Sequence, residues 1–195
     1  MPAMTTHGTR TRRWTRAEYD RLIELGIFQL GDPIELIGGE LMVAEPQSSE
    51  HYTAIRKCAK ALEAAFGPGW DVRTQGPVNL DDESEPEPDV AVVAGSPEDY
   101  RRAHPSHPVL TLEISLSHLT IDRVRKGSLY ARAGLADYWV LNLVNRTLEV
   151  YREPAADAEA PFGWSYARRE VVAASGRVTP LAAPTASVAV TDLLP

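Results

Sequence analysis

Residues 85–93 read EPEPDVAVV and residues 109–115 read VLTLEIS, and each of these apolar stretches carries a carboxylate where none is expected. Asp89 opens the first apolar run, and Glu113 lies inside the second. Strands with such long apolar runs are usually buried, and burying an unpaired charge is costly. Each acid therefore needs a shifted pKa, a charged partner or a metal ion. Together with Lys126, which follows on the next predicted helix, the two acids predict a divalent-metal site.

The composition is that of an ordinary globular protein. The chain has 195 residues, of which 44% are hydrophobic and 24% are charged, and this length suits one domain with a sizeable core. Residues 1–13 are rich in threonine and arginine, and we expect them to form a flexible N-terminal tail. We expect a single domain over residues 14–195.

Charge and cysteine content narrow the class of protein. The formal net charge of −7 argues against strong non-specific binding of nucleic acid, but not against an enzyme of nucleic acid, because bound cations can offset it. Cys58 is the single cysteine, which excludes an internal disulfide and suits a reducing compartment. No apolar stretch approaches the roughly 20 residues that a membrane span needs. We therefore expect a cytoplasmic protein without membrane contact.

Hydrophobic periodicity and turn residues predict the elements around the two acidic strands. Helices are expected from Thr15, over residues 49–66, and from Thr120 or Asp122 to Gly134. Gly38-Gly39 predicts a tight hairpin between residues 34–37 and 40–43.

Further strands are expected at residues 70–80, 89–94, 109–115, 137–143, 147–151, 164–167 and 171–173, with a strand or turn at 187–194. The acidic, proline-containing residues 81–87 are expected to form a solvated loop. This order predicts an α/β sandwich with a mixed sheet flanked by helices, plus an N-terminal helix and hairpin.

Further polar residues could serve the site. Glu35 and Glu40 alternate with apolar neighbours in the hairpin and could face a cleft, although the polar face of an edge hairpin explains both as well, and Glu40 is taken as a candidate accessory residue. Glu50 and His51 lie in the first turn of the helix over residues 49–66, where Glu50 could instead serve the helix dipole and His51 could be a surface or capping residue. Ser115 shares a strand face with Glu113.

The residue types indicate one chemistry above others. Two carboxylates from neighbouring strands suit Mg²⁺, which prefers oxygen ligands and keeps several waters. A bound Mg²⁺ lowers the pKa of a water and stabilises charge on a phosphate oxygen, and a lysine beside it can orient that water or stabilise the developing charge. Such a set would hydrolyse a phosphodiester, although spacing alone is not specific to it.

Several stretches resemble the Uma-two family of restriction-endonuclease-like proteins, which belongs to the PD-(D/E)XK nuclease superfamily. The resemblance rests on Pro88-Asp89, on LEIS at residues 112–115, on KGSLYARAGLADYWV at residues 126–140, and on the hairpin IELIGGEL at residues 34–41. It covers roughly residues 14–153 and is specific in the order of the motifs as well as in the motifs themselves.

This resemblance implies a restriction-endonuclease-like core of helix, strand, strand, strand, helix and strand, and a Mg²⁺-dependent endonuclease that cleaves DNA as a homodimer, with Mn²⁺ as a substitute. It implies that Asp89 and Glu113 are metal ligands, together with the backbone carbonyl of Ile114. Ser115 stands where the superfamily carries its lysine, and the resemblance implies that Lys126 on the following helix replaces it. Glu50 or His51 loosely matches an additional acid that some members place on the first core helix.

A second reading stays open at the level of sequence. The loss of lysine from the third motif position and the acidic net charge also suit a catalytically inactive nuclease fold that serves as a dimeric binding or interaction module. Metal binding distinguishes the two readings. A serine hydrolase is a weaker third class, because the chain has no G-x-S-x-G motif.

Overall fold

The computed structural model describes residues 11–29, 31–43 and 46–195. Of the predicted tail over residues 1–13, residues 1–10 lie outside this description. In chain order the elements are α1 (Arg16–Glu24), β1 (Ile34–Ile37), β2 (Glu40–Val43), α2 (Ser49–Phe66), β3 (Trp70–Thr74), β4 (Val90–Ala94), η1 (Pro97–Tyr100), β5 (Leu110–Ser115), η2 (Ile121–Lys126), α3 (Gly127–Arg132), β6 (Asp137–Asn142), β7 (Thr147–Ala156), β8 (Trp164–Ala173), β9 (Arg177–Val178), β10 (Val188–Ala189) and α4 (Val190–Leu193).

A six-stranded sheet in the order β3-β4-β5-β6-β7-β8 forms the centre of the fold. Strands β5 and β6 are parallel, and the other neighbouring pairs are antiparallel. A parallel pair needs a crossover between its strands, and η2 and α3 provide it. The expected mixed sheet flanked by helices is therefore confirmed.

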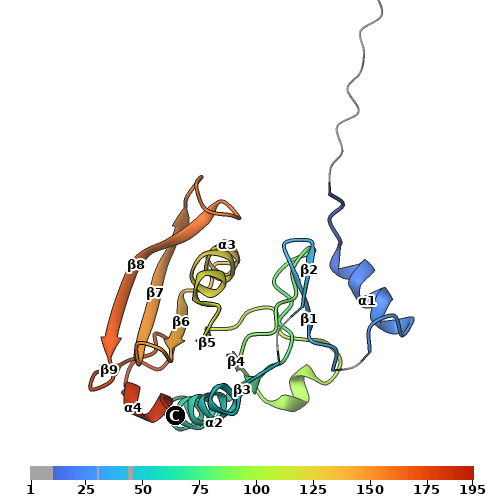
Figure 1. The fold of residues 1–195 in the computed structure, drawn as a ribbon. Helices are drawn as coiled ribbons and strands as arrows, with labels where there is room; N and C mark the ends of the chain where they lie inside the picture. The colour runs from blue at the N-terminus through green and yellow to red at the C-terminus, as the bar shows by residue number, and fades with distance from the viewer. Residues whose placement is uncertain (1–10, 30, 44–45) are drawn as a thin grey trace, which may run out of the picture.

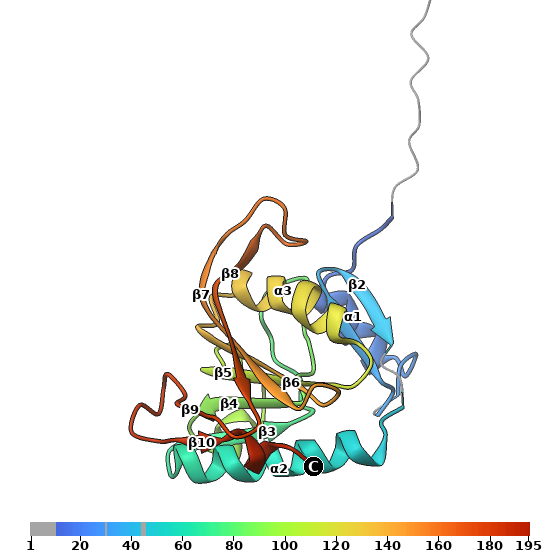
Figure 2. The same ribbon diagram turned by 60° about the vertical axis from the view of Figure 1, so that its left-hand side comes forward.

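Helices cover the two faces of this sheet unequally (Figures 1 and 2). Helix α2 runs along one face beneath β3, β4 and β5, and the C-terminal helix α4 packs beside it. Helix α3 lies on the opposite face against β7 and β8, and the β1–β2 hairpin stands beside it (Figure 1). The start of β4, next to Asp89, and the end of β5, which carries Glu113, thus lie between α2 on one side and the hairpin with η2 on the other.

Strand β5 is buried on both faces. Its side chains point alternately to the apolar core and to the opposite face, which carries Glu113 and Ser115. Leu110, Leu112 and Ile114 join the apolar core that α2 contributes to. Glu113 and Ser115 point to the opposite face, where they are 3% and 2% exposed. Because successive strand residues point to opposite faces, a carboxylate at position 113 is held away from the α2 core.

Local signals placed several elements correctly. Thr15 caps α1 with the predicted capping box to Glu18, and α2 spans the expected residues with Ser48 at its N-terminus. Gly38 and Gly39 form the hairpin turn with φ values of 57° and 78°, a backbone region that costs little only for glycine.

Several strand predictions were wrong in length, and the strand predicted over residues 147–151 runs on to Ala156 as β7. The strand predicted over residues 70–80 ends at Thr74, since Gln75 takes a φ of 50° and Pro77 has no N–H for a ladder. The two short strands predicted at 164–167 and 171–173 are one continuous strand, β8, paired with β7 throughout. Its central polar residues lie on an exposed edge, where a strand needs no apolar pattern.

The solvated loop predicted over residues 81–87 is also wrong, because this segment packs under the hairpin. The Glu85 main-chain N–H donates to the Leu36 carbonyl at 2.8 Å, and the Gly39 N–H donates to the Glu83 carbonyl at 2.7 Å. Ser84 is fully buried and Glu85 is 5% exposed. These main-chain hydrogen bonds to the hairpin hold the segment inside the fold. The charged residues of the segment gave no sign of such bonds, so the sequence predicted a solvated loop.

The buried Glu85 predicts a pH-dependent stability. Burial and the nearby carboxylates of Asp20 and Glu87 raise its pKa from 4.5 to about 7, against the attraction of Arg16. Because the folded-state pKa is the higher one, stability from this group is full below pH about 4.5 and is lost as the pH rises to about 7. Glutamine does not titrate. Between these pH values we therefore expect the free energy of unfolding of Glu85→Gln to fall by about 1–2 kcal/mol less than that of the wild type, after allowance for solvent screening.

Urea unfolding of both proteins at pH 5 and pH 8 measures this effect. The wild type should lose more unfolding free energy between the two pH values than Glu85→Gln does. Equal losses in the two proteins would contradict a raised pKa of Glu85.

Candidate active site

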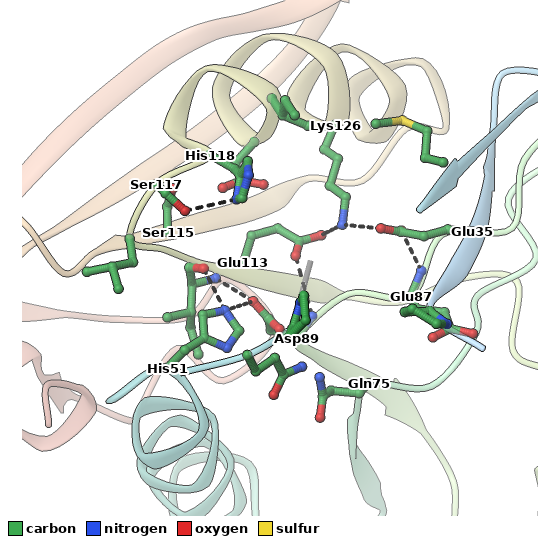
Figure 3. Close-up of a pocket in the computed structure, with 18 of the residues that line it drawn as sticks. Glu35, His51, Gln75, Glu87, Asp89, Glu113, Ser115, Ser117, His118 and Lys126 are labelled. Carbon is green, nitrogen blue, oxygen red and sulfur yellow. Dashed lines mark hydrogen bonds and ion pairs between the residues drawn. The ribbon is translucent and has the colours of Figure 1, made fainter. Parts of the chain in front are cut away.

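A cavity of about 710 Å³ opens where the hairpin, the N-terminal end of α2, the end of β5 and η2 meet. Asp89, Glu113 and Lys126 all line it, together with His51, Ser115 and Ile114. Most of the residues predicted from sequence as site residues are therefore brought to one place (Figure 3).

Asp89 is held at the entrance of β4 by the neighbouring strand. Its Oδ2 accepts the main-chain N–H of Ile114 at 2.7 Å, and its own N–H lies 3.4 Å from Glu113 Oε2. These two contacts cross from β4 to β5 and orient both carboxylates toward each other. Pairing of the strands thus brings the acids of residues 89 and 113 together, as expected.

Glu113 has a second set of partners on the crossover helix. Its Oε1 lies 3.2 Å from Lys126 Nζ and accepts the hydroxyl of Tyr130 at 2.8 Å. Lys126 and Tyr130 are four residues apart, so they lie on the same side of the helix. The expected reach of Lys126 from the helix to the Glu113 strand is present in the structure.

The crossover between β5 and β6 begins with a π-helix, which favours the contact of Lys126 with Glu113. Residues Ile121–Lys126 are π-helical, and Asp122 and Lys126 are both buried there. A π-turn is wider than an α-turn, and it occurs frequently at functional sites. The sequence pattern predicted an ordinary helix here, because nothing in the hydrophobic spacing reports a wider turn.

Lys126 is enclosed by acids. Its Nζ lies between the carboxylates of Glu113 and Glu35, at 3.2 Å and 3.1 Å (Figure 3). Burial alone would lower the pKa of Lys126, but Glu113 and Glu35, with more distant acids, outweigh burial and raise it. Lys126 therefore remains an ammonium ion and can act as a fixed positive charge rather than as a base.

The carboxylates of the cavity outnumber this lysine. Burial raises the pKa of Glu113 to about 8 even though Lys126 opposes the shift, and burial with the charge of Glu35 raises the pKa of Glu87 to about 7. The pKa of Asp122 is raised as well, chiefly by burial. Burial therefore makes the charged form of these carboxylates costly, and a bound cation would offset that cost, because an opposite charge nearby favours the ionised carboxylate.

His51 connects the start of α2 to both acidic strands. Its Nε2 lies 2.9 Å from the Ile114 carbonyl oxygen and 3.2 Å from Asp89 Oδ2. A carbonyl only accepts hydrogen bonds, so Nε2 carries the proton and donates. Burial opposes the charged imidazole, but Asp89 and the Ile114 carbonyl outweigh it and raise the pKa of His51.

Two predicted accessory residues do not reach the cavity. Glu40 is exposed near the hairpin turn, where it pairs with Arg125 at 2.7 Å. Glu50 is exposed in the first turn of α2. Ser115, by contrast, is buried in the cavity wall beside Asp122, in the position from which the superfamily pattern expects a lysine.

Sequence reasoning missed several residues that line the cavity or contact its acids. These are Glu87, Asp122 and Tyr130. Glu35 was considered for a cleft together with Glu40, because both alternate with apolar residues in the hairpin, and of these two only Glu35 lines the cavity. Glu87 was assigned to a solvated loop, and Asp122 and Tyr130 were read as the start and a packing residue of a helix.

The donors present fit a hard divalent cation. Asp89, Glu113 and the Ile114 carbonyl supply oxygen only, which Mg²⁺ and Mn²⁺ prefer. Asp89 Oδ2 and the Ile114 oxygen converge on a common donor, His51 Nε2. Within residues 11–29, 31–43 and 46–195, no group of three or more His, Cys, Asp or Glu side chains is arranged to hold a metal. Two side chains and a carbonyl suit a cation that keeps several waters, as Mg²⁺ does.

Comparisons with known proteins show the family and the fold of this chain. In a crystal structure from Anabaena variabilis, described as a "putative nuclease belonging to DUF820", 94% of that chain matches 87% of this one, with 17% identity and a TM-score of 0.66, which shows a shared fold. No curated protein matches the sequence. A model of the Uma2 family, described as "Putative restriction endonuclease", matches residues 16–190. The chain therefore belongs to the Uma2 family of restriction-endonuclease-like proteins.

Proposed function

We propose that this protein is a Mg²⁺-dependent endonuclease that hydrolyses phosphodiester bonds in DNA, with Mn²⁺ as a substitute. The observation that carries the proposal is the convergence of Asp89, Glu113 and Lys126 in one cavity, with Glu113 bridging the other two. Membership of a restriction-endonuclease-like family supports it, since such proteins generally use divalent metals.

In this proposal Asp89, Glu113 and the Ile114 carbonyl hold the metal ion. When bound, Mg²⁺ supplies a water of lowered pKa and stabilises charge on the phosphate oxygens. Lys126, a permanent cation beside Glu113, orients the attacking water or stabilises the negative charge that develops on the phosphoryl group. Ser115 takes the strand position at which the superfamily carries its lysine, and in this proposal Lys126 from the helix supplies that charge instead.

His51 and the main chain hold the acids in place. His51 donates to the Ile114 carbonyl and to Asp89, while the Ile114 N–H donates to the same Asp89 oxygen. These contacts leave the second oxygen of Asp89 available to a cation. Such supporting hydrogen bonds orient a ligand and are needed for full affinity.

A cleavage assay tests the proposal directly. Supercoiled plasmid and duplex oligonucleotides are incubated with the protein and Mg²⁺, Mn²⁺ or EDTA. We expect cleavage with either metal and none with EDTA. An absence of cleavage across both metals and both substrates would contradict the proposed activity.

Metal binding gives a prediction that does not need a known DNA sequence. Mg²⁺ at about 100 times its Kd should stabilise the folded protein by about 2.7 kcal/mol, which raises Tm by roughly 5–10 °C. Asp89→Asn should abolish this rise, because it removes a charged ligand. Thermal melts with and without Mg²⁺ measure the effect, and Ca²⁺ serves as a second oxygen-binding cation for comparison.

The same melts decide between the two readings of the sequence. An inactive nuclease fold that serves as an interaction module predicts no rise in Tm with Mg²⁺ or Mn²⁺.

The proposal also includes a homodimer in the cytoplasm. The dimer follows from the family resemblance, and the compartment follows from the single cysteine, Cys58. Light scattering on the purified protein tests the dimer. Among the described residues, no helix is both long and apolar enough to span a bilayer.

A further inference from the structure

Glu35 contacts Lys126 from the side opposite Glu113. Its Oε1 lies 3.1 Å from Lys126 Nζ, and its Oε2 accepts the main-chain N–H of Glu87 at 3.0 Å. The side chains of Glu35 and Lys126 are 12% and 10% exposed, so both are removed from bulk water. Figure 3 shows the Lys126 amino group between the two carboxylates.

The length of the Lys126 side chain explains why a second partner is needed. Lys126 reaches the site from η2 through a four-carbon stem with several rotamers. A contact with Glu113 alone would let the ammonium ion move around that oxygen. Two carboxylates on opposite sides restrict it to the space between β1 and β5.

Glu35 is itself held in place. Its second oxygen is bonded to the Glu87 N–H, and the preceding residues 83–85 are hydrogen-bonded to the hairpin through Leu36 and Gly39. The hairpin and the segment that leads into Asp89 therefore form one unit that carries the Glu35 carboxylate. This unit connects the position of Lys126 to the strand that supplies Asp89.

We propose that Glu35 is a positioning residue, which holds the ammonium group of Lys126 at the Glu113 carboxylate for phosphodiester hydrolysis. This inference rests on the proposed function and adds the β1–β2 hairpin to the machinery of the site. Glu35 acts through Lys126 and does not touch the reacting atoms. Its loss therefore impairs the chemical step rather than the binding of DNA or metal.

Glu35→Gln isolates this role. A glutamine retains an oxygen that accepts the Glu87 N–H, but it removes the negative charge that faces Lys126. We expect kcat for plasmid cleavage to fall about 100-fold, as for a misplaced catalytic group, with KM changed by less than about twofold. Glu35→Asp restores the charge one methylene further away and should recover part of the activity.

Asp81→Asn is the matched control. Asp81 also accepts a main-chain N–H with one oxygen, from Glu83 at 2.9 Å, and pairs with a cation, Arg132, through the other. It does not line the cavity. We expect this variant to retain the wild-type kcat, so that loss of a carboxylate ion pair in general cannot explain the effect of Glu35→Gln.

Calorimetric titration with Mg²⁺ separates positioning from metal binding. Glu113→Gln should lose most of the Mg²⁺ affinity, whereas Glu35→Gln should keep it. A loss of affinity in Glu35→Gln equal to that in Glu113→Gln would make Glu35 a metal ligand and overturn the proposal. An unchanged kcat in Glu35→Gln would overturn it as well.

A thermal double-mutant cycle tests the contact without any activity. Glu35→Gln and Lys126→Met should each lower Tm, and the double variant should lose about 2–4 °C less than their sum, because the two groups interact. Strict additivity would show that Glu35 does not hold Lys126. If the wild type cleaves no DNA while the cycle shows coupling, the proposed nuclease function fails and the Glu35–Lys126 contact stands.

Discussion

Replacing Lys126 with methionine should lower DNA cleavage by about 1,000-fold. Methionine keeps the packing of the long side chain but removes the positive charge 3.2 Å from Glu113. Asp89→Asn should have an effect at least as large, since it keeps an oxygen for the Ile114 N–H but loses the charge that a metal ion requires. Plasmid cleavage with Mg²⁺ under single-turnover conditions measures both losses.

Lys60→Met is the control for the Lys126 variant. Lys60 is an exposed lysine on α2 and does not line the cavity, so its loss should leave cleavage unchanged. Purified variants must first show cooperative thermal unfolding, because Lys126 is buried. Equal cleavage by the wild type, Asp89→Asn and Lys126→Met would assign the activity to a contaminant and remove the proposed site.

The largest stability effect is expected at Asp137, at the start of β6. This side chain is fully buried. Its Oδ1 accepts the Trp139 indole N–H and the Arg152 Nε–H, both at 2.8 Å, and its Oδ2 accepts the Leu181 N–H at 2.8 Å. One carboxylate thus joins β6, β7 and the C-terminal segment.

Asp137→Ala removes the carboxylate partner of the Arg152 guanidinium, which is 15% exposed and keeps, among the described residues, only the Thr179 carbonyl. It also leaves the Trp139 and Leu181 N–H groups unpaired. We expect a loss of about 3–5 kcal/mol in the free energy of unfolding, equivalent to a fall in Tm of roughly 10 °C. Urea unfolding gives the free energy. A loss below about 1 kcal/mol would mean that these hydrogen bonds are replaced by water at little cost.

Glu170→Ala provides the comparison for an exposed ion pair. Glu170 pairs with Arg168 on β8 at 3.7 Å, and both side chains are more than half exposed. Such pairs contribute about 0–1 kcal/mol, so this variant should be close to the wild type. A large loss here would indicate that β8 depends on charge pairing rather than on its ladder with β7.

Much of the local structure followed from residue types. The capping box at Thr15, the Gly38-Gly39 turn and the apolar spacing of α2 each act within a few residues, so their signals are complete in the sequence. The prediction failed for residues 81–87, where acidic residues and prolines suggested solvent. There the backbone pairs with a hairpin more than 40 residues earlier, a contact that composition does not encode.

The candidate site likewise contains residues that the sequence could identify and residues that only the tertiary structure places. Asp89, Glu113 and Lys126 could be named from the sequence, because a charged residue in an apolar run, or a lysine that follows one, is unusual enough to be noticed. Glu35 and Glu40 carry the same alternating pattern, and only the packing of the hairpin places Glu35 beside Lys126 and Glu40 beside Arg125. Periodicity gives the face of a strand but not what lies opposite that face.

The sequence by itself determined the strands that carry Asp89 and Glu113 and the family to which the chain belongs. The tertiary structure decided how the charge of Lys126 is balanced. The π-helical turn brings Lys126 to Glu113, and the hairpin brings Glu35 to its other side. Glu113 lies 13 positions before Lys126 in the sequence, and Glu35 lies 91 positions before it. Coulombic interactions depend on distance in space and on burial, which are properties of the folded chain.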